Sequence, residues 1–300
     1  MPIFNDKKFK MHVLAITTIF LWSFNYVFTR IAVRYYPPES FAFLRYAVAS
    51  FTLLAYAFIK KVRPPVLRDV PLFFFGGAIG FAFYIYLFNT GTQFVAASVA
   101  SFINSSAPVI TVVFARIFLK EKISGLGWAS AVCAFAGVGI ITLSGGAEFN
   151  LGGLWILGGA MLFSGYSIFQ RKLLLHYKPL EITTYCIIAG GIMLSVFAHR
   201  SLPYFLTAPP VQILAVVFTG VFPAAIAYVC WANALSHADK TNEVTNYLFI
   251  LPILTTILGF IIINEVPGAS VYIGGGVVIL SVLGVNLQNK YKIQVESRDS

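Results

Sequence analysis

Charged residues are scarce in this sequence. Only 11% of its 300 residues are Asp, Glu, Lys or Arg, whereas 58% are hydrophobic and the mean hydropathy is +0.82. Water-soluble domains contain roughly 45–50% apolar residues. The composition therefore excludes an ordinary soluble fold and indicates a protein that lies in a bilayer.

The sequence also lacks the residue patterns of catalysis and of metal binding. Its cysteines, Cys133, Cys186 and Cys230, lie in apolar segments and form no CxxC pair, so they predict neither a zinc site nor redox chemistry. The histidines form no HExxH motif, and Gly268-Ala-Ser270 lacks the glycine that a GxSxG elbow requires. We therefore expect no enzyme, no metal and no cofactor, and an intramembrane enzyme is the weaker alternative.

Long apolar runs are what the sequence has instead. They are bounded by charges, Pro or Gly and lie at 11–29, 41–59, 71–90, 95–118, 126–144, 153–170, 181–199, 211–235, 243–263 and 270–288. A helix needs roughly 20 apolar residues to cross a bilayer, and the runs lack the strict alternation of a membrane barrel. The predicted fold class is all-α integral membrane, with ten transmembrane helices.

Basic residues indicate the orientation. The N-terminus has no small-residue cleavage site, so the first helix is predicted to be retained. If both termini face the cytoplasm, every Lys and Arg falls on that side except Arg30, Arg34, Arg45 and Arg200. The net charge of +10 then reflects loops at an anionic leaflet and not a nucleic-acid partner. The predicted location is the cell (inner) membrane.

The sequence contains an internal repeat. Trp22-Ser-Phe-Asn-Tyr-Val-Phe-Thr-Arg30 is similar to Phe163-Ser-Gly-Tyr-Ser-Ile-Phe-Gln-Arg171 in the later half of the chain, and Pro38 matches Pro179 at the same interval. Further along the interval is slightly longer, and the matched pairs are Asn89 with Asn233, Pro108 with Pro252, Thr111 with Thr255, and Glu121 with Glu265. The chain is therefore predicted to contain two five-helix halves.

Five is an odd number, so the second half must enter the membrane from the opposite side. The loop charges agree, because the basic stretch 60–68 corresponds to the nearly uncharged loop 200–210. The predicted organisation is a cytoplasmic N-terminus at 1–10, inverted repeats at 11–145 and 146–289, and a cytoplasmic tail at 290–300. Inverted repeats place a binding site near the midplane, where the halves meet.

These features together resemble the drug/metabolite transporter superfamily, and specifically its ten-helix EamA-type exporters. The residues that carry the resemblance are Leu21-Trp-Ser23, Arg45, Asn104-Ser-Ser-Ala-Pro108, Lys120-Glu-Lys122, Leu251-Pro252 and Glu265. The resemblance covers nearly the whole chain. It implies efflux of metabolites or drugs through a central cavity and does not name the solute.

Polar residues recur on one face of the first run. Thr18, Trp22, Asn25 and Thr29 are spaced four, three and four residues apart, which puts them on one side of a helix. An amide that faced lipid would be costly, so this face is predicted to point into the bundle or a wet cavity. Asn25 then either contacts solute or hydrogen-bonds a neighbouring helix.

The prolines of the fourth and ninth runs are predicted hinges. Pro108 should leave the carbonyl of Asn104 without a backbone donor, and Pro252 should do the same to Leu248. Free carbonyls at matching depths suit a binding cleft or hinge, and an ordinary kink is the alternative. Asn104 and Ser105 are predicted to line the cavity beside Pro108.

Other polar and aromatic residues complete the predicted lining. They are Tyr84, Tyr166, Tyr228, Trp231, Asn246 and Tyr247. Aromatic side chains with polar tips suit flat or amphipathic solutes, including amino acids and their relatives. The alternative for any one of them is packing or an interfacial anchor.

Two charged residues are candidates for charge recognition or coupling. Arg45 lies within the second run and could bind a carboxylate, although it could instead reach the outer surface or pair with Glu39. Glu243, at the start of the ninth run, is the nearest candidate for proton coupling, because no acid lies in the middle of a run.

The predicted function is a secondary transporter of small metabolites, such as amino acids, related compounds or drugs, that exports by alternating access between the two halves. An uptake permease or facilitator for a sugar- or nucleotide-derived solute is the alternative. Facilitated diffusion, exchange and proton antiport all remain open. The expected partners are the solute, the lipid bilayer and protons as a coupling ion, with a monomer or weak homodimer as the assembly.

Overall fold

The structure is a computed structural model that describes residues 6–120, 123, 125–143, 151–237, 244 and 246–296. Within these residues every regular element is helical and no strand occurs. Seven helical stretches are long and apolar enough to cross a membrane, and shorter apolar helices lie at Gly125–Ile141, Leu251–Ile263 and Ala269–Ser281. The predicted all-α membrane class is confirmed at this level.

The helices divide into an earlier and a later group. The earlier group is α1 (Asp6–Ala32), α2 (Pro38–Ile59), η1 (Leu67–Asp69), α3 (Val70–Gly77), η2 (Ala78–Ala82), α4 (Phe83–Thr92), α5 (Ala97–Asn104), α6 (Ala107–Leu119) and α7 (Gly125–Leu143). The later group is α8 (Leu151–Leu173), α9 (Pro179–Leu194), η3 (Ser195–Phe197), α10 (Ala198–Leu206), α11 (Pro210–Val221), η4 (Phe222–Ile226), α12 (Ala227–His237), η5 (Asn246–Ile250), α14 (Leu251–Ile263) and α15 (Ala269–Glu296).

Local sequence sets many of these boundaries. Helices α2 and α9 begin at Pro38 and Pro179, where the ring presets φ and the missing N–H would have had no helical partner. Helices α6 and α14 are capped by Lys120 and Asn264, which adopt the left-handed conformation with φ of 56° and 53°. The stretch 200–210, predicted to be a loop, is helical as far as Leu206, and Ser201 is buried in it.

From η2 onward, several elements recur in the later group at a constant interval, the longer of the two found in the sequence. The pairs of starting residues are Phe83 and Ala227 for α4 and α12, Ala107 and Leu251 for α6 and α14, and Gly125 and Ala269 for α7 and α15. Even the two π-helical turns, η2 and η4, begin at this interval, at Ala78 and Phe222. Such turns are rare and often occur at functional sites, and nothing in the sequence analysis predicted them.

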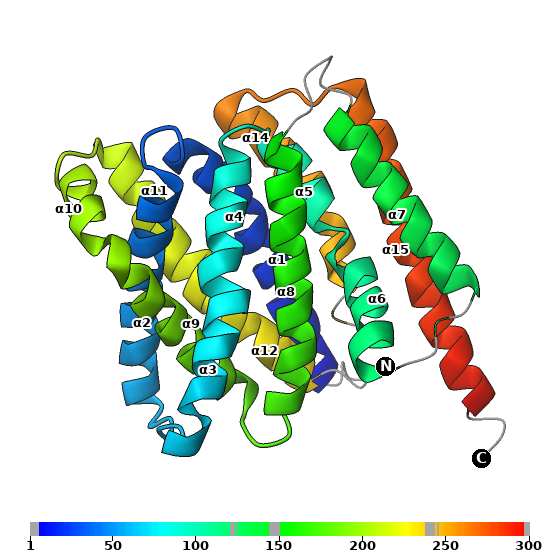
Figure 1. Cartoon of the computed structure of the whole chain (residues 1–300), viewed down its shortest axis with the longest axis horizontal. Coiled ribbons are helices and arrows are strands. Elements are labelled where there is room, and N and C mark those ends of the chain that lie inside the picture. Colours follow the sequence, from blue (N-terminus) through cyan, green and yellow to red (C-terminus); the bar gives the residue numbers. More distant parts are fainter. Residues whose placement is uncertain are drawn as a thin grey trace.

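The helices form one bundle with a distinct edge (Figure 1). Helix α1 packs against α5, α11, α12 and α14, whereas α7 and α15 pack on each other at one edge. Gly137 and Gly274 allow that close approach, since a Cβ added to either would lie 2.7 or 2.6 Å from the other's carbonyl oxygen. The start of α1 and the end of α15 lie at the same end of the bundle in this view.

Candidate functional site

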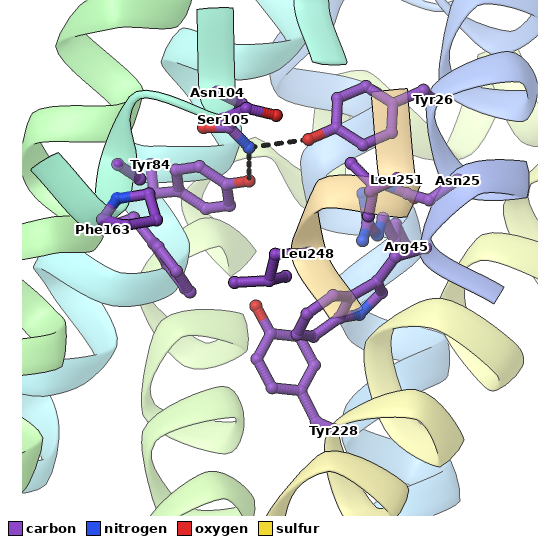
Figure 2. Close-up of a pocket in the computed structure, with 13 residues that line it drawn as sticks. Asn25, Tyr26, Arg45, Tyr84, Asn104, Ser105, Phe163, Tyr228, Leu248 and Leu251 are labelled. Atoms are coloured by element: carbon purple, nitrogen blue, oxygen red, sulfur yellow. Dashed lines mark hydrogen bonds between the residues drawn. The ribbon is translucent and has the colours of Figure 1, made fainter. Parts of the chain in front are cut away.

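A cavity lies inside the bundle where helices of both groups meet (Figure 2). The space that the centre of a water-sized sphere can occupy in it is about 120 Å³. One water requires roughly 10–15 Å³ by the same definition. The residues that line it are Trp22, Asn25, Tyr26, Arg45, Tyr84, Asn104, Ser105, Ala107, Pro108, Phe163, Tyr228, Leu248 and Leu251. The cavity therefore has room for a small solute and combines polar with aromatic walls.

Asn104 organises the polar side of the cavity. Its Nδ2 donates to the Tyr26 hydroxyl at 2.8 Å and to the Tyr84 hydroxyl at 3.3 Å, as Figure 2 shows. These bonds tie α5 to α1 and α4 and leave Asn104 Oδ1 buried without a partner within the described residues. Each tyrosine hydroxyl keeps its own proton to donate to another group.

Arg45 is the charged residue of this lining. Its side chain is only 4% exposed, and its Nε and Nη1 are buried without a hydrogen-bond partner among the described residues. The guanidinium lies 5.6 Å from the centre of the Tyr46 ring. Glu39 makes no ion pair with it, although both residues lie in the described part of the chain. An arginine at the centre of a membrane helix costs roughly 2.5–3.5 kcal/mol on insertion scales, so this unsatisfied charge calls for a ligand or water.

Aromatic rings form the opposite side. The ring of Trp22 lies 5.3 Å from that of Tyr228 and 5.2 Å from that of Trp231, measured between centroids. The indole Nε1 of Trp22 donates to the carbonyl of Pro223 at 3.2 Å, which belongs to the π-helical turn η4. Since this bond satisfies the indole, Trp22 presents an apolar face to the cavity.

The structure brings together some of the residues that the sequence singled out. Those that line the cavity are Trp22, Asn25, Arg45, Tyr84, Asn104, Ser105, Pro108 and Tyr228. Arg45 reaches neither the outer surface nor Glu39, so the two structural alternatives for it are wrong. Whether any of these side chains contacts a solute stays a prediction.

Other predicted residues lie outside the lining. Thr29 is fully buried, Trp231 packs against Trp22 with the two rings tilted by 42°, and Tyr247 hydrogen-bonds His12 near the start of α1. Tyr166 packs on Gly80, where an added Cβ would lie 2.5 Å from the tyrosine ring. Pro252 is buried at the start of α14. Glu243, with the side chain of Asn246, lies outside the described residues.

Sequence reasoning missed five lining residues. They are Tyr26, Ala107, Phe163, Leu248 and Leu251. Four of them carry no polar signal, but the internal repeat would have found two. Phe163 is the counterpart of Trp22 and Leu248 that of Asn104, at the intervals that relate the two halves, whereas Leu251 is the counterpart of Ala107, which was missed as well.

Both predicted hinge prolines lie at breaks between helices. Pro108 follows the turn that separates α5 from α6, and Pro252 follows the 3-10 segment η5 at the start of α14. Each proline removes the N–H that would have bonded the carbonyl four residues earlier, at Asn104 and Leu248. Such broken helices are tolerated at membrane depth where they line a cavity.

A cluster of polar contacts around Glu265 joins several helices at one end of the bundle. We call Arg30, Arg34, Gln93, Ala97 and Glu265 the Glu265 cluster. Glu265 accepts from Arg30 Nε at 2.9 Å and from the Ala97 backbone N–H at 2.8 Å, and Arg34 lies 3.7 Å away. Arg30 also donates to the carbonyls of Thr92 and Gln93, which end α4. In contrast to Arg45, Arg30 thus has partners within the protein.

No group of three or more His, Cys, Asp or Glu side chains that could hold a metal ion occurs in the part of the chain that the structure describes. The described cysteines are free thiols: Cys133 is exposed, Cys186 is buried, and Cys230 is intermediate.

The sequence matches the EamA-like transporter family twice, over residues 9–143 and 150–287. Curated relatives span nearly the same length. The chain is 31% identical over 276 residues to the uncharacterized transporter YdfC of Bacillus subtilis, which covers 90% of each chain. It is 29% identical over 272 residues to a "probable terminal-alkyne amino-acid exporter" of Streptantibioticus cattleyicolor, which covers 90% of this chain and 91% of that protein.

The fold has a precedent among solved structures. One crystal structure aligns with 92% of this chain and 98% of its own chain, with a TM-score of 0.64 and 20% sequence identity. The family and the relatives named above are transporters and not enzymes. With both family matches covering most of its length and apolar helices of membrane-spanning length, the chain belongs to the EamA-like transporter family and is a multi-pass membrane transporter.

Proposed function

We propose that this transporter is a secondary carrier that exports small metabolites, amino acids or related compounds in particular, by alternating access. It crosses the cell membrane ten times, as inverted five-helix repeats at residues 11–145 and 146–289, with both termini in the cytoplasm. Drugs are a further candidate class of solute.

The central cavity is the observation that carries this proposal. It lies between the two family-matched segments, which we call the first segment (residues 9–143) and the second segment (residues 150–287), and both contribute to its lining. Helix breaks at Pro108 and Pro252 adjoin it. Transporters with inverted repeats bind solute at the repeat interface near the midplane, next to discontinuous helices.

The repeat supports ten crossings. The shorter apolar helices match helices of the other half. Leu251, where Leu251–Ile263 begins, is the counterpart of Ala107, where α6 begins, and Ala269, where Ala269–Ser281 begins, is the counterpart of Gly125, where α7 begins. An odd number of crossings per repeat inverts the second one, and the basic loops then lie on one side. The start of α1 and the end of α15, at one end of the bundle in Figure 1, agree with termini on the same side.

The Glu265 cluster supports alternating access. It ties the end of α1 and the start of α5 to the connection between α14 and α15, and so joins the first segment to the second at this end of the bundle. A carrier must close one end while the other admits solute. We propose that this cluster closes the outer end.

Amino acids are favoured because the cavity pairs polar amide and guanidinium groups with aromatic walls. The name of the Streptantibioticus relative points in the same direction. Export is favoured on that name and on the family resemblance.

The test is efflux from liposomes that contain the purified protein and a labelled mixture of amino acids, with and without an imposed proton gradient. We expect selective, saturable efflux of some members of the mixture. Dependence on the gradient would assign proton coupling, and Glu243→Gln would then test the residue that the sequence offers as the candidate for coupling.

A matched pair of variants separates cavity transport from leakage. Ala107→Phe fills the cavity and should abolish efflux, whereas Ala136→Phe adds the same ring on the exposed face of α7 and should not. Equal efflux from both variants, or no saturable efflux of any solute, would contradict the proposed carrier.

A further inference from the structure

The cavity contains several buried polar atoms that have no hydrogen-bond partner among the residues that the structure describes. Nε and Nη1 of Arg45, Oδ1 of Asn25 and Oδ1 of Asn104 are all buried without a hydrogen bond within the described residues. Arg45 is 4% exposed and Asn25 is 8% exposed. A buried donor or acceptor without a partner destabilises the protein, so each of these atoms is expected to meet a group that enters the cavity.

The unsatisfied atoms are of two complementary kinds. The guanidinium of Arg45 offers only donors and a positive charge, whose best partner is a carboxylate or another small anion. The two amide oxygens offer only acceptors, whose best partner is a cationic N–H donor. The lining contains no acidic residue, so nothing in it neutralises Arg45.

The Asn104 oxygen is held in position by the protein. Because Nδ2 of Asn104 donates to Tyr26 and Tyr84, its oxygen is turned away from those hydroxyls. Figure 2 shows Arg45 beside Asn25 on one side of the cavity, with Asn104 above, Leu248 toward the middle and Tyr228 below. The unsatisfied atoms of Arg45 and Asn25 therefore lie on one side of the cavity, and Asn104 lies above them.

The second segment supplies almost none of this polarity. The counterparts of Asn25, Arg45 and Asn104 at the repeat interval are Tyr166, Cys186 and Leu248. Helix α9 forms with Cys186 in the place of Arg45, so the repeated architecture does not itself need a cation there. A charge that the repeated architecture does not require, and whose Nε and Nη1 have no hydrogen-bond partner within the described residues, indicates a role in binding.

We propose that the solute is an α-amino acid with an apolar side chain. Arg45 binds its carboxylate, the oxygens of Asn25 and Asn104 accept from its ammonium group, and its side chain lies against Phe163, Tyr228, Leu248 and Leu251. This inference rests on the proposed function and adds the class of solute and the orientation in which the solute is bound.

The test is a binding series on the purified protein in which one functional group changes at a time. Binding is first measured for labelled alanine, valine, leucine, methionine and phenylalanine. The tightest binder is then compared with its amino alcohol, which lacks the carboxylate, and with its deaminated acid, which lacks the ammonium group. We expect the amino alcohol to bind roughly ten- to hundredfold more weakly, since a bond to a charged group is lost.

Variants of Arg45 connect that loss to one side chain. Arg45→Gln should weaken amino-acid binding by the same factor and leave the affinity for the amino alcohol nearly unchanged, while Arg45→Lys should recover part of the loss. Arg200→Gln removes an exposed arginine from α10 and should change neither affinity. If Arg45→Gln does not fold, Arg45→Lys and the wild-type series still decide the question.

Two results would overturn the inference, and they differ from a failure of the proposed function. One is an amino alcohol that binds as tightly as its amino acid. The other is no binding of any of the five amino acids by a protein that exports another solute from liposomes. If no solute crosses at all, the carrier function itself fails.

Discussion

The first and second segments can be compared position by position at the cavity. Trp22 and Phe163, Tyr84 and Tyr228, Asn104 and Leu248, and Ala107 and Leu251 are counterparts at the repeat interval, and all eight line the cavity. The aromatic pairs are similar in the two segments, but the others are not. The amide of Asn104 corresponds to the isobutyl group of Leu248, and the methyl group of Ala107 corresponds to the isobutyl group of Leu251.

The difference separates what the fold requires from what the solute requires. Positions that are similar in both segments include the tyrosines Tyr84 and Tyr228, which both line the cavity, and the prolines Pro108 and Pro252, of which only Pro108 lines it. The positions that differ concentrate hydrogen-bonding groups in the first segment and apolar surface in the second. A symmetric scaffold thereby gives an asymmetric cavity, which can hold a solute in one orientation.

The largest expected effect comes from disrupting one close backbone contact between the two segments. In α3, a Cβ at Gly77 would lie 2.7 Å from the carbonyl oxygen of Cys186 and 2.7 Å from the backbone nitrogen of Gly190 in α9. Because backbone atoms cannot move aside cheaply, Gly77→Ala should destabilise the protein by about 3 kcal/mol or prevent assembly. Thermal unfolding in detergent measures the change.

Gly139→Ala is the matched control, because a Cβ there meets nothing within 4 Å. Alanine is the better helix former by about 1 kcal/mol, so this variant should be neutral or stabilised. Equal melting temperatures for the two variants would show that the close approach of α3 and α9 is not needed.

The next largest effect should follow when Asn104 of the first segment is replaced by leucine, the residue at the matching position of the second segment. Asn104→Leu removes the bonds to Tyr26 and Tyr84 together with the free oxygen in the cavity. We expect a roughly ten- to hundredfold loss of transport, since about 1–3 kcal/mol of hydrogen bonding is lost. Initial rates of amino-acid efflux from liposomes, normalised to folded protein, measure it.

The reciprocal variant, Leu248→Asn, adds an amide where the cavity can hydrate it, so transport should change by less than about threefold. Similar losses in Asn104→Leu and Leu248→Asn would mean that the two walls are equivalent and that the segments do not differ in how they bind solute.

A smaller effect is expected at the end of the bundle. Glu265→Gln keeps the side-chain shape but removes the charge that Arg30 and Arg34 contact. If the closed state of that end is destabilised by about 1 kcal/mol, the fraction of molecules that are open at that end should rise about fivefold. A Ser105→Cys reporter, in a background without the native cysteines, would be labelled faster by an impermeant maleimide in right-side-out vesicles.

Glu39→Gln provides the control for this variant, because Glu39, at the start of α2, forms no ion pair within the described residues. It should leave the labelling rate unchanged. An unchanged labelling rate in Glu265→Gln as well would show that the Glu265 cluster does not help to close the cavity.

Much of the architecture could be predicted from the sequence because apolar length and repeated prolines are local signals. The all-α membrane class follows from the apolar runs, and Pro108 and Pro252 mark the breaks where helices α6 and α14 begin. The π-helical turns η2 and η4 left no such signal. They arise from how the surrounding helices pack, and no single residue type specifies them.

Polar cavity residues were easier to predict from the sequence than apolar ones. Asn25 and Trp22 share a helical face that the spacing identified, but Thr29 lies on the same face, one turn further on, and is fully buried. A helix rises about 6 Å over four residues, so a side chain one turn further along the same face can lie beyond the end of a cavity of this size. Tyr26 was missed although it lies four residues after Trp22, on the same side of the helix, where its hydroxyl accepts a hydrogen bond from Asn104.

The smallest effect should come from the tyrosine counterparts, and it compares the segments most directly. Tyr84 accepts a hydrogen bond from Asn104, but no bond to the Tyr228 hydroxyl is present within the described residues. Tyr84→Phe removes a protein partner of about 1 kcal/mol and should lower efflux about three- to fivefold. Tyr228→Phe removes only a hydroxyl that faces the cavity and should lower it less than twofold. Because both substitutions remove the same atom from equivalent helices, a larger loss for Tyr228 would mean that the solute's polar group lies on the second segment, which would reverse the proposed orientation.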